Sequence, residues 1–203
     1  MPSPCDRAVA LTFDDGPHPV WTPRVLAALQ SCDASATFFV HAAQAERHVR
    51  LVEKILHGGH EIGLHCWRHL RHGRHSAAVI EADTNRALEA LGGVGVHPCW
   101  WRVPWGQLGP STPRIARTRG LRVIGWDLDT HDWRGDRAVT MLEHVTPGLR
   151  PGAIVLMHDG LGPGARRTLC GETVRLLAPL VRALRERGCE PTTVSAALRC
   201  CPT

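Results

Sequence analysis

The sequence contains no tyrosine and a single lysine, Lys54, so all but one of its 24 basic residues are arginine. The arginines are scattered along the chain without a long basic run, and the net charge of +5 therefore indicates no nucleic-acid surface. No stretch of the 203 residues is long and apolar enough for a membrane-spanning helix. We expect neither a nucleic-acid partner nor a membrane span.

The eight cysteines do not occur in CxxC pairs, which argues against a cysteine-based structural zinc site. An even number of cysteines permits disulfides, and Cys5 and Cys189 would be neighbours if the first and last strands lie side by side. Reduced, buried thiols are the alternative. No charged and apolar leader follows Met1, which favours a cytoplasmic protein, while the cysteines leave a secreted mature form open.

Short apolar runs alternate with longer segments of helical period, and no linker or repeat divides the chain. The expected strands are Ala8–Phe13, Ala36–Val40, His60–Leu64, Cys99–Val103, Leu121–Asp127, Ala153–Met157 and Pro191–Val194. The expected helices are Thr22–Leu29, Ala45–His57, Ala77–Leu91, Thr112–Arg119, Asp136–Val145 and Thr168–Arg187. This alternation predicts a single α/β domain over residues 1–203 with a parallel sheet, either open or closed into a barrel.

Polar side chains follow nearly every expected strand. In chain order they are Asp14 and Asp15, His65 and His69, Arg102 with Pro104 and Trp105, Asp129 with Asp132 and Trp133, and His158 with Asp159. Ligands bind beyond the carboxyl ends of the strands in such folds, so we expect these groups to form one site.

Two histidines spaced four apart, His65 and His69, would share one face of a helical turn. With one aspartate they make a site of two histidines and one carboxylate, which holds a divalent metal and leaves positions open. Such a metal polarises a carbonyl and lowers the pKa of bound water to about 7. The adjacent Asp14 and Asp15 can then serve as one ligand and one general base. His158, with an ordinary pKa near 6.5, suits the general acid.

Five segments in fixed order carry a family resemblance: TFDDGP, HCWRH, RVPWG, DLDTHDW and VLMHDG. From about residue 8 to about residue 195, the chain resembles the polysaccharide deacetylase family, also called the NodB homology domain or carbohydrate esterase family four. The resemblance implies a distorted (β/α)7 barrel of parallel strands. It also implies metal-dependent removal of an N-acetyl group from an amino sugar, with an O-acetyl or formyl group as the alternative.

The resemblance assigns roles to individual residues. Asp14 resembles the catalytic base, Asp15, His65 and His69 resemble the ligands of one divalent ion, and Arg102 resembles the arginine that holds the base ionised. Zinc is the leading metal, with cobalt, nickel and manganese as alternatives. The oligomeric state stays open.

The remaining roles concern the acid and the substrate pocket. Asp132 would orient and tune the acid His158, and the backbone N–H of Trp105 would help to bind the oxyanion. The resemblance assigns the pocket itself to Pro104, Trp105, Trp133 and Leu156. The expected partner is an acetylated amino sugar, either small or part of an oligosaccharide.

The second motif departs from the family pattern at two positions. Leu64 and Cys66 flank His65 where the family usually has asparagine and a hydroxyl residue. Leu64 removes a polar group beside a ligand, which can alter metal affinity or substrate fit. Cys66 either replaces the hydroxyl as a weaker hydrogen-bonding group or acts as a ligand or oxidisable thiol.

Two other functions stay open. A non-haem iron oxygenase uses the same ligand set, but it does not need the base Asp14, the acid His158 or the RVPWG segment. A non-catalytic sugar-binding relic of the fold is the other alternative, because fold alone does not imply function. Against the relic, every acid, base and ligand position carries a competent residue.

Overall fold

The computed structural model describes residues 7–198 and contains, within that range, one sheet of eight strands. The strands are β1 (Ala8–Asp14), β2 (Thr37–His41), β3 (Glu61–Cys66), β4 (Trp100–Trp101), β5 (Arg122–Val123), β6 (Leu128–Asp129), β7 (Ile154–His158) and β8 (Glu190–Thr192). Their order is β5-β4-β3-β2-β1-β7-β6, with β8 paired to β1. Every pair is parallel, so the carboxyl ends of the strands meet at one edge.

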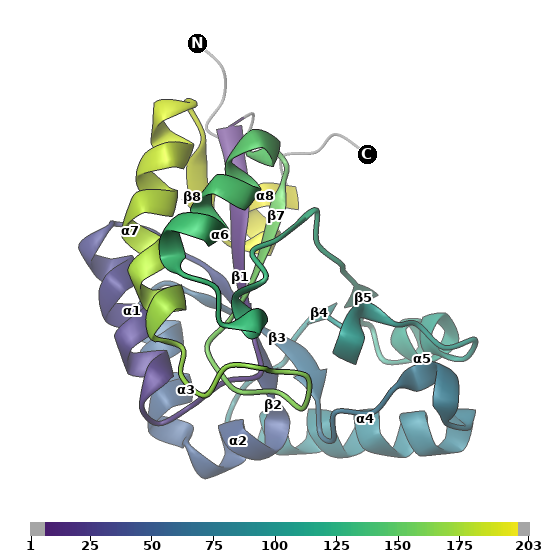
Figure 1. Ribbon diagram of the computed structural model, residues 1–203. Coiled ribbons are helices and arrows are strands. Elements are labelled where there is room, and N and C mark those ends of the chain that lie inside the picture. The colour runs from purple at the N-terminus through teal and green to yellow at the C-terminus, as the bar shows by residue number, and fades with distance from the viewer. Residues whose placement is uncertain (1–6, 199–203) are drawn as a thin grey trace.

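Eight α-helices are assigned in the described range, and Figure 1 shows them arranged around the central strands. They are α1 (Trp21–Ser31), α2 (Ala42–Arg47), α3 (Val49–His57), α4 (Ala77–Gly93), α5 (Thr112–Thr118), α6 (Ala138–Val145), α7 (Gly171–Glu186) and α8 (Val194–Leu198). Short 3₁₀ turns η2 (His72–Arg74), η3 (Pro104–Gly106), η4 (Asp132–Arg134) and η5 (Thr146–Gly148) lie in the connections. None of the helices assigned here is long and apolar enough to cross a membrane.

β1 has two faces with different partners, although all seven of its residues are buried. Val9, Leu11 and Phe13 belong to the large core between the sheet and the helices. Ala8 and Ala10 point the other way, into a smaller cluster that α8 covers with Val194 and Ala197. Thr12 and Asp14 continue this second row, so the strand's alternation carries Asp14 into the interior of the curved sheet.

The predicted α/β class with parallel strands in a single domain is confirmed, and the distorted barrel is a half-barrel, but the fifth expected strand is wrong. Residues 121–127 do not form one strand. Their beginning pairs with β4, since Ile124 N–H donates to the carbonyl of Trp101 at 3.0 Å, and their end pairs with β7, since Asp127 N–H donates to the carbonyl of Ile154 at 2.9 Å. The run bridges the two edges of the sheet, which stays open between β5 and β6 in the described part of the chain.

Two further boundaries differ from the expectation. The expected helix Ala45–His57 is two helices, because His48 has non-helical dihedral angles (φ −123°, ψ 49°) between α2 and α3. The expected last strand is shorter, and Val194 begins α8 instead. The predicted disulfide between Cys5 and Cys189 stays a prediction, because Cys5 lies outside the described residues.

The apolar face of α7 generates a stability prediction. Leu180 is fully buried on this helix, whereas Val139 on α6 is 53% exposed. Leu180→Ala should lower the free energy of unfolding by about 2–5 kcal/mol, since it leaves a cavity in the core. Val139→Ala is the control and should change the free energy by about 0.5 kcal/mol or less. Urea denaturation measures both, and equal losses in the two variants would contradict the assigned core.

Candidate metal centre and acid-base site

Asp14 ends β1 on the interior side of the sheet, and its residue is only 4% exposed. It lies in register with His158 on β7, so both side chains leave their strands on the same face. Burial raises the pKa of Asp14, and the opposing charge of Arg102 only partly offsets this effect. We expected Arg102 to keep Asp14 ionised, and its charge acts in that direction, but burial has the larger effect.

Arg102 is fully buried at the end of β4 and faces Asp14. Its Nη1 donates to Asp14 Oδ1 at 3.0 Å and to Thr12 Oγ1 at 2.6 Å, and its Nη2 donates to the carbonyl of Gly125 at 2.8 Å. The guanidinium also lies 4.2 Å from the centre of the Phe39 ring. These contacts fix the cation beside the carboxylate, as the family resemblance implies.

Asp15, His65 and His69 converge on one point. Asp15 leaves the strand with a φ of 73°, which turns its carboxylate away from Asp14. Its Oδ1 lies 3.5 Å from His65 Nε2 and 3.5 Å from His69 Nε2, and the three potential ligand atoms lie within 4.8 Å of one another. Asp15 Oδ1 is buried without a hydrogen-bond partner. A buried carboxylate oxygen that faces two imidazole nitrogens is suited to a cation.

Both histidines are in the form that metals bind. His65 Nδ1 lies 2.8 Å from the carbonyl of Arg102, and because this contact requires the proton on Nδ1, Nε2 keeps its lone pair. Burial lowers the pKa of His65 to about 3 and that of His69 to about 3, so both rings are neutral near pH 7. Burial also raises the pKa of Asp15 to about 6. The residues present therefore fit a divalent ion.

The local structure of the histidine pair differs from the expectation of a helical turn. His65 lies in β3, and His69 lies in the loop that follows. Asp83 on α4 holds this loop, because its carboxylate accepts the backbone N–H groups of Trp67 at 3.2 Å and Arg68 at 3.1 Å. The sequence reasoning missed Asp83. No local signal marks it, since it lies on a helix 14 residues or more from both histidines.

His158 and Asp132 form the expected pair. Asp132 Oδ1 lies 2.7 Å from His158 Nδ1, and Asp132 Oδ2 accepts the backbone N–H of His158 at 2.9 Å. Burial disfavours the imidazolium, but Asp132, together with Asp15 and Asp14, outweighs it and raises the pKa of His158 to about 9. Burial likewise opposes ionisation of Asp132, but His158 and Arg167 lower its pKa to about 2. The pair is thus an imidazolium and a carboxylate near pH 7.

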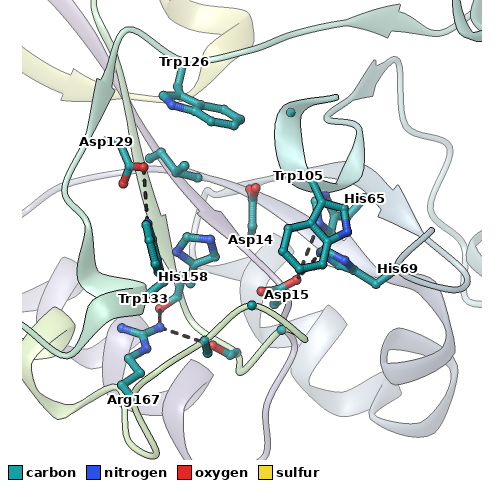
Figure 2. A pocket seen from close by; sticks show the side chains of 16 residues that line it. Asp14, Asp15, His65, His69, Trp105, Trp126, Asp129, Trp133, His158 and Arg167 are labelled. Atoms are coloured by element: carbon teal, nitrogen blue, oxygen red, sulfur yellow. Dashed lines mark hydrogen bonds and ion pairs between the residues drawn. The ribbon is translucent and has the colours of Figure 1, made fainter. Parts of the chain in front are cut away.

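A pocket of about 240 Å³ is lined by the three candidate ligands together with Asp14 and His158 (Figure 2). Trp105, Trp133 and Leu156 line it as expected, whereas Pro104 is buried and does not. Asp129 also lines the pocket, in agreement with its expected place after a strand. The lining further includes Trp126, Arg167 and the loop with Gly160, Gly162, Gly164 and Ala165, which were not predicted from the sequence. In Figure 2, Trp105 and Trp133 lie on opposite sides, and Trp126 lies at a third.

The loop over the pocket approaches Asp15 so closely that only glycine fits. A Cβ on Gly162 would lie 2.1 Å from Asp15 Oδ2, and one on Gly160 would lie 2.4 Å from the carbonyl oxygen of Asp15. A Cβ on Gly164 would lie 2.7 Å from the Trp105 ring. Such contacts are far shorter than van der Waals distances, so the three glycines let backbone serve as the wall of the site.

Comparison with known proteins decides the family. The profile of the family described as polysaccharide deacetylase matches residues 2–124. The chain belongs to the polysaccharide deacetylase family. It is 33% identical over 196 residues to a peptidoglycan-N-acetylglucosamine deacetylase of Bacillus cereus, with 96% of this chain and 89% of the relative covered. It is 34% identical over 191 residues to a chitooligosaccharide deacetylase of a Bradyrhizobium strain, with 91% and 87% covered.

The fold of a solved family member agrees with this assignment. A crystal structure of a peptidoglycan N-acetylglucosamine deacetylase, in complex with 4-naphthalen-1-yl-N-oxidanyl-benzamide, superposes with a TM-score of 0.86 and 28% identity. The alignment covers 94% of this chain and 87% of that one. The curated relatives are named as deacetylases of carbohydrates, which is consistent with a hydrolase, and metal binding is general in the family. The expected family and enzyme class are thus confirmed.

The contact between Gly162 and Asp15 predicts a loss of metal affinity on substitution. Gly162→Ala should displace the loop or the Asp15 carboxylate and weaken zinc binding by roughly 10-fold or more, the scale for groups that orient ligands. Gly73→Ala is the control, since a Cβ there meets nothing within 4 Å. Calorimetric titration with zinc measures both. Wild-type affinity in Gly162→Ala would contradict the close approach.

The His158–Asp132 pair predicts a titration in the metal-free protein. His158 should titrate near pH 9, and Asp132→Asn should lower its pKa towards or below the ordinary 6.5, because the variant removes the negative charge that stabilises the imidazolium. NMR titration of the ring protons measures this pKa, with the signal assigned by its loss in His158→Gln. Asp136→Asn, in the same connection, is the control. An unmoved titration in Asp132→Asn would show that the carboxylate does not set the charge of His158.

Proposed function

We propose that this chain is a metal-dependent de-N-acetylase of an amino sugar, either small or part of an oligosaccharide. The observation that carries the proposal is the cluster of Asp15, His65 and His69, with an unpaired buried carboxylate oxygen, beside a separate base and a separate acid. Zinc is the ion we propose for this cluster, since nitrogen and carboxylate ligands suit it.

The bound ion supplies a Lewis acid that polarises a carbonyl and favours ionisation of water. Asp14 is the base that accepts a proton from the attacking water, and Arg102, in contact with its Oδ1, holds the carboxylate in place. The oxygen of that water forms a bond to the acetyl carbon, and the carbon–nitrogen bond breaks. The products are acetate and the free amine of the sugar.

His158 is the acid that protonates the departing nitrogen. Its Nδ1 is bonded to Asp132, so Nε2 is the atom available to donate the proton. A pKa of about 9 keeps the ring protonated at neutral pH, as a donor to an amine requires. The base and the acid thus have neighbours of opposite charge. Asp14 lies beside an arginine, which favours its ionised form, and His158 lies beside a carboxylate, which favours its protonated form.

The pocket supports an acetamido group on a sugar ring as the substrate. Leu156 supplies an apolar surface for a methyl group, and three tryptophans supply faces on which a sugar ring can pack. A volume of about 240 Å³ is below the roughly 300–1,000 Å³ of drug-sized sites, so the pocket fits one sugar unit and not several. The named relatives act on peptidoglycan N-acetylglucosamine and on chitooligosaccharide, which fits this class.

The geometry disfavours the two alternatives. An oxygenase requires neither the Asp14–Arg102 pair nor the His158–Asp132 pair, yet both are built around the same pocket. A sugar-binding relic has no requirement for an acid and a base held by opposite charges. The O-acetyl and formyl alternatives concern the same site and differ only in the leaving group or the acyl group.

Acetate release tests the proposal. Zinc-loaded protein is incubated with N-acetylglucosamine oligosaccharides and peptidoglycan fragments, and acetate is measured together with bound zinc. His69→Ala should lose zinc and acetate release together, whereas Asp14→Asn should retain zinc and lose turnover by roughly 10²-fold or more.

His75→Ala is the control for the histidine substitution, because this side chain is exposed in the same segment, and it should retain both properties. A full equivalent of zinc in His69→Ala would contradict the ligand assignment. Oxygen consumption without acetate release would favour the oxygenase, and sugar binding without either reaction would favour the relic.

A further inference from the structure

Arg167 is a buried arginine whose role neither the metal cluster nor the base explains. It lies between β7 and α7, and its side chain is 5% exposed. Its Nη1 donates to Asp132 Oδ2 at 2.8 Å and also contacts Thr173 Oγ1. Its Nη2 donates to the carbonyl oxygens of His158 at 2.9 Å and Gly160 at 3.2 Å, as Figure 2 shows. One guanidinium therefore contacts both members of the acid pair and the first residue of the glycine-rich loop.

The loop held in this way, residues 160–166, is the wall of the pocket opposite the strand ends. Gly160 and Gly162 lie against Asp15, and Gly164 lies against Trp105. The carbonyl of Trp133 accepts the backbone N–H of Arg166 at 2.8 Å, which attaches the end of the loop to the other side of the pocket. Arg167 follows directly, so any movement of this loop away from Asp15 would also draw the guanidinium away from Asp132.

We propose that Arg167 is a positioning residue that holds the His158–Asp132 pair and the loop 160–166 in a single arrangement, so that the proton donor and the pocket wall are set together. This inference rests on the proposed function. The contacts explain why an arginine is required. The planar guanidinium directs two nitrogens to a carboxylate and two carbonyl oxygens at once, which the single ammonium of lysine cannot match.

The charges around Asp132 support the same role. Asp132 is 1% exposed, and its negative charge acts on Asp15. Asp14 and Asp15 also act on His158, the partner of Asp132. The cationic partners of Asp132 are His158 and Arg167, and Thr173 Oγ1 donates to the same Oδ2 at 2.8 Å. When His158 gives up its proton, Arg167 remains as the cation beside Asp132, so the carboxylate stays paired through the reaction.

Variants of Arg167 test the proposal in the zinc-loaded protein. Arg167→Gln should retain a full equivalent of zinc but lower kcat for acetate release from N-acetylglucosamine oligosaccharides by roughly 10- to 100-fold, with a smaller change in KM, the scale of a misplaced catalytic group. Arg167→Lys should recover part of the loss, because it restores the charge without the planar fork. Arg182→Gln, an exposed arginine on α7, is the control and should behave as wild type.

A second readout does not depend on turnover. The ring N–H of His158, bonded to Asp132, should exchange slowly with water and give an NMR signal in the wild-type protein and in Arg182→Gln, assigned by its loss in His158→Gln. The signal should broaden or vanish in Arg167→Gln and persist in part in Arg167→Lys. A variant that is less stable but still folded, with the hydrogen bond between His158 and Asp132 intact, would keep this signal.

The outcomes separate this inference from the proposed function. An unchanged kcat together with an unchanged His158 signal in Arg167→Gln would overturn the positioning role. If that variant does not fold, wild-type values of both readouts in Arg167→Lys would overturn the requirement for the guanidinium. If the wild type releases no acetate, the proposed function fails, and the NMR signal still tests the positioning of His158.

Discussion

Three of the carboxylates withdrawn from water at one edge of the sheet, Asp14, Asp15 and Asp132, require a positive partner, whereas Asp159, buried at the same edge, accepts a hydrogen bond from Thr22 Oγ1. Arg102 pairs with Asp14, while His158 and Arg167 pair with Asp132. Asp15 faces two neutral imidazoles and no arginine, which makes it the carboxylate suited to an added cation. The distribution of buried positive charge therefore divides the three acids among base, ligand and tuning roles.

The fold produces this arrangement through its parallel strands. Because all paired strands run in one direction, β1, β3, β4 and β7 deliver Asp14, His65, Arg102 and His158 to the same edge. The inner row of β1 changes from alanine to threonine to aspartate towards that edge. The apolar cluster that α8 covers is therefore followed along the strand by the polar site. Core packing and site geometry thus come from the same alternation.

Much of this could be predicted from sequence, because strand alternation and five short motifs are local signals. The parallel class, β1 and the convergence of the motif residues are of this kind. No local signal shows that residues 121–127 divide between β4 and β7, because this division depends on which strands of the open sheet the backbone of the run pairs with. Arg167, Asp83, Gly162 and Gly164 lie outside the motifs, and their importance comes from contacts with residues far along the chain. A scattered arginine and a glycine-rich loop carry no local signal for such contacts.

The position of the metal tests whether Asp15 is the ligand and Asp14 the base. Crystals of the zinc-bound protein, measured at the zinc absorption edge, should show one strong anomalous peak per chain. We expect this peak at about 2.0–2.2 Å from the Asp15 carboxylate and at about 2.0–2.1 Å from Nε2 of His65 and of His69, with Asp14 hydrogen-bonded to Arg102 instead. A peak ligated by Asp14 or Cys66, or no peak among these three residues, would contradict the division of roles between the two adjacent aspartates.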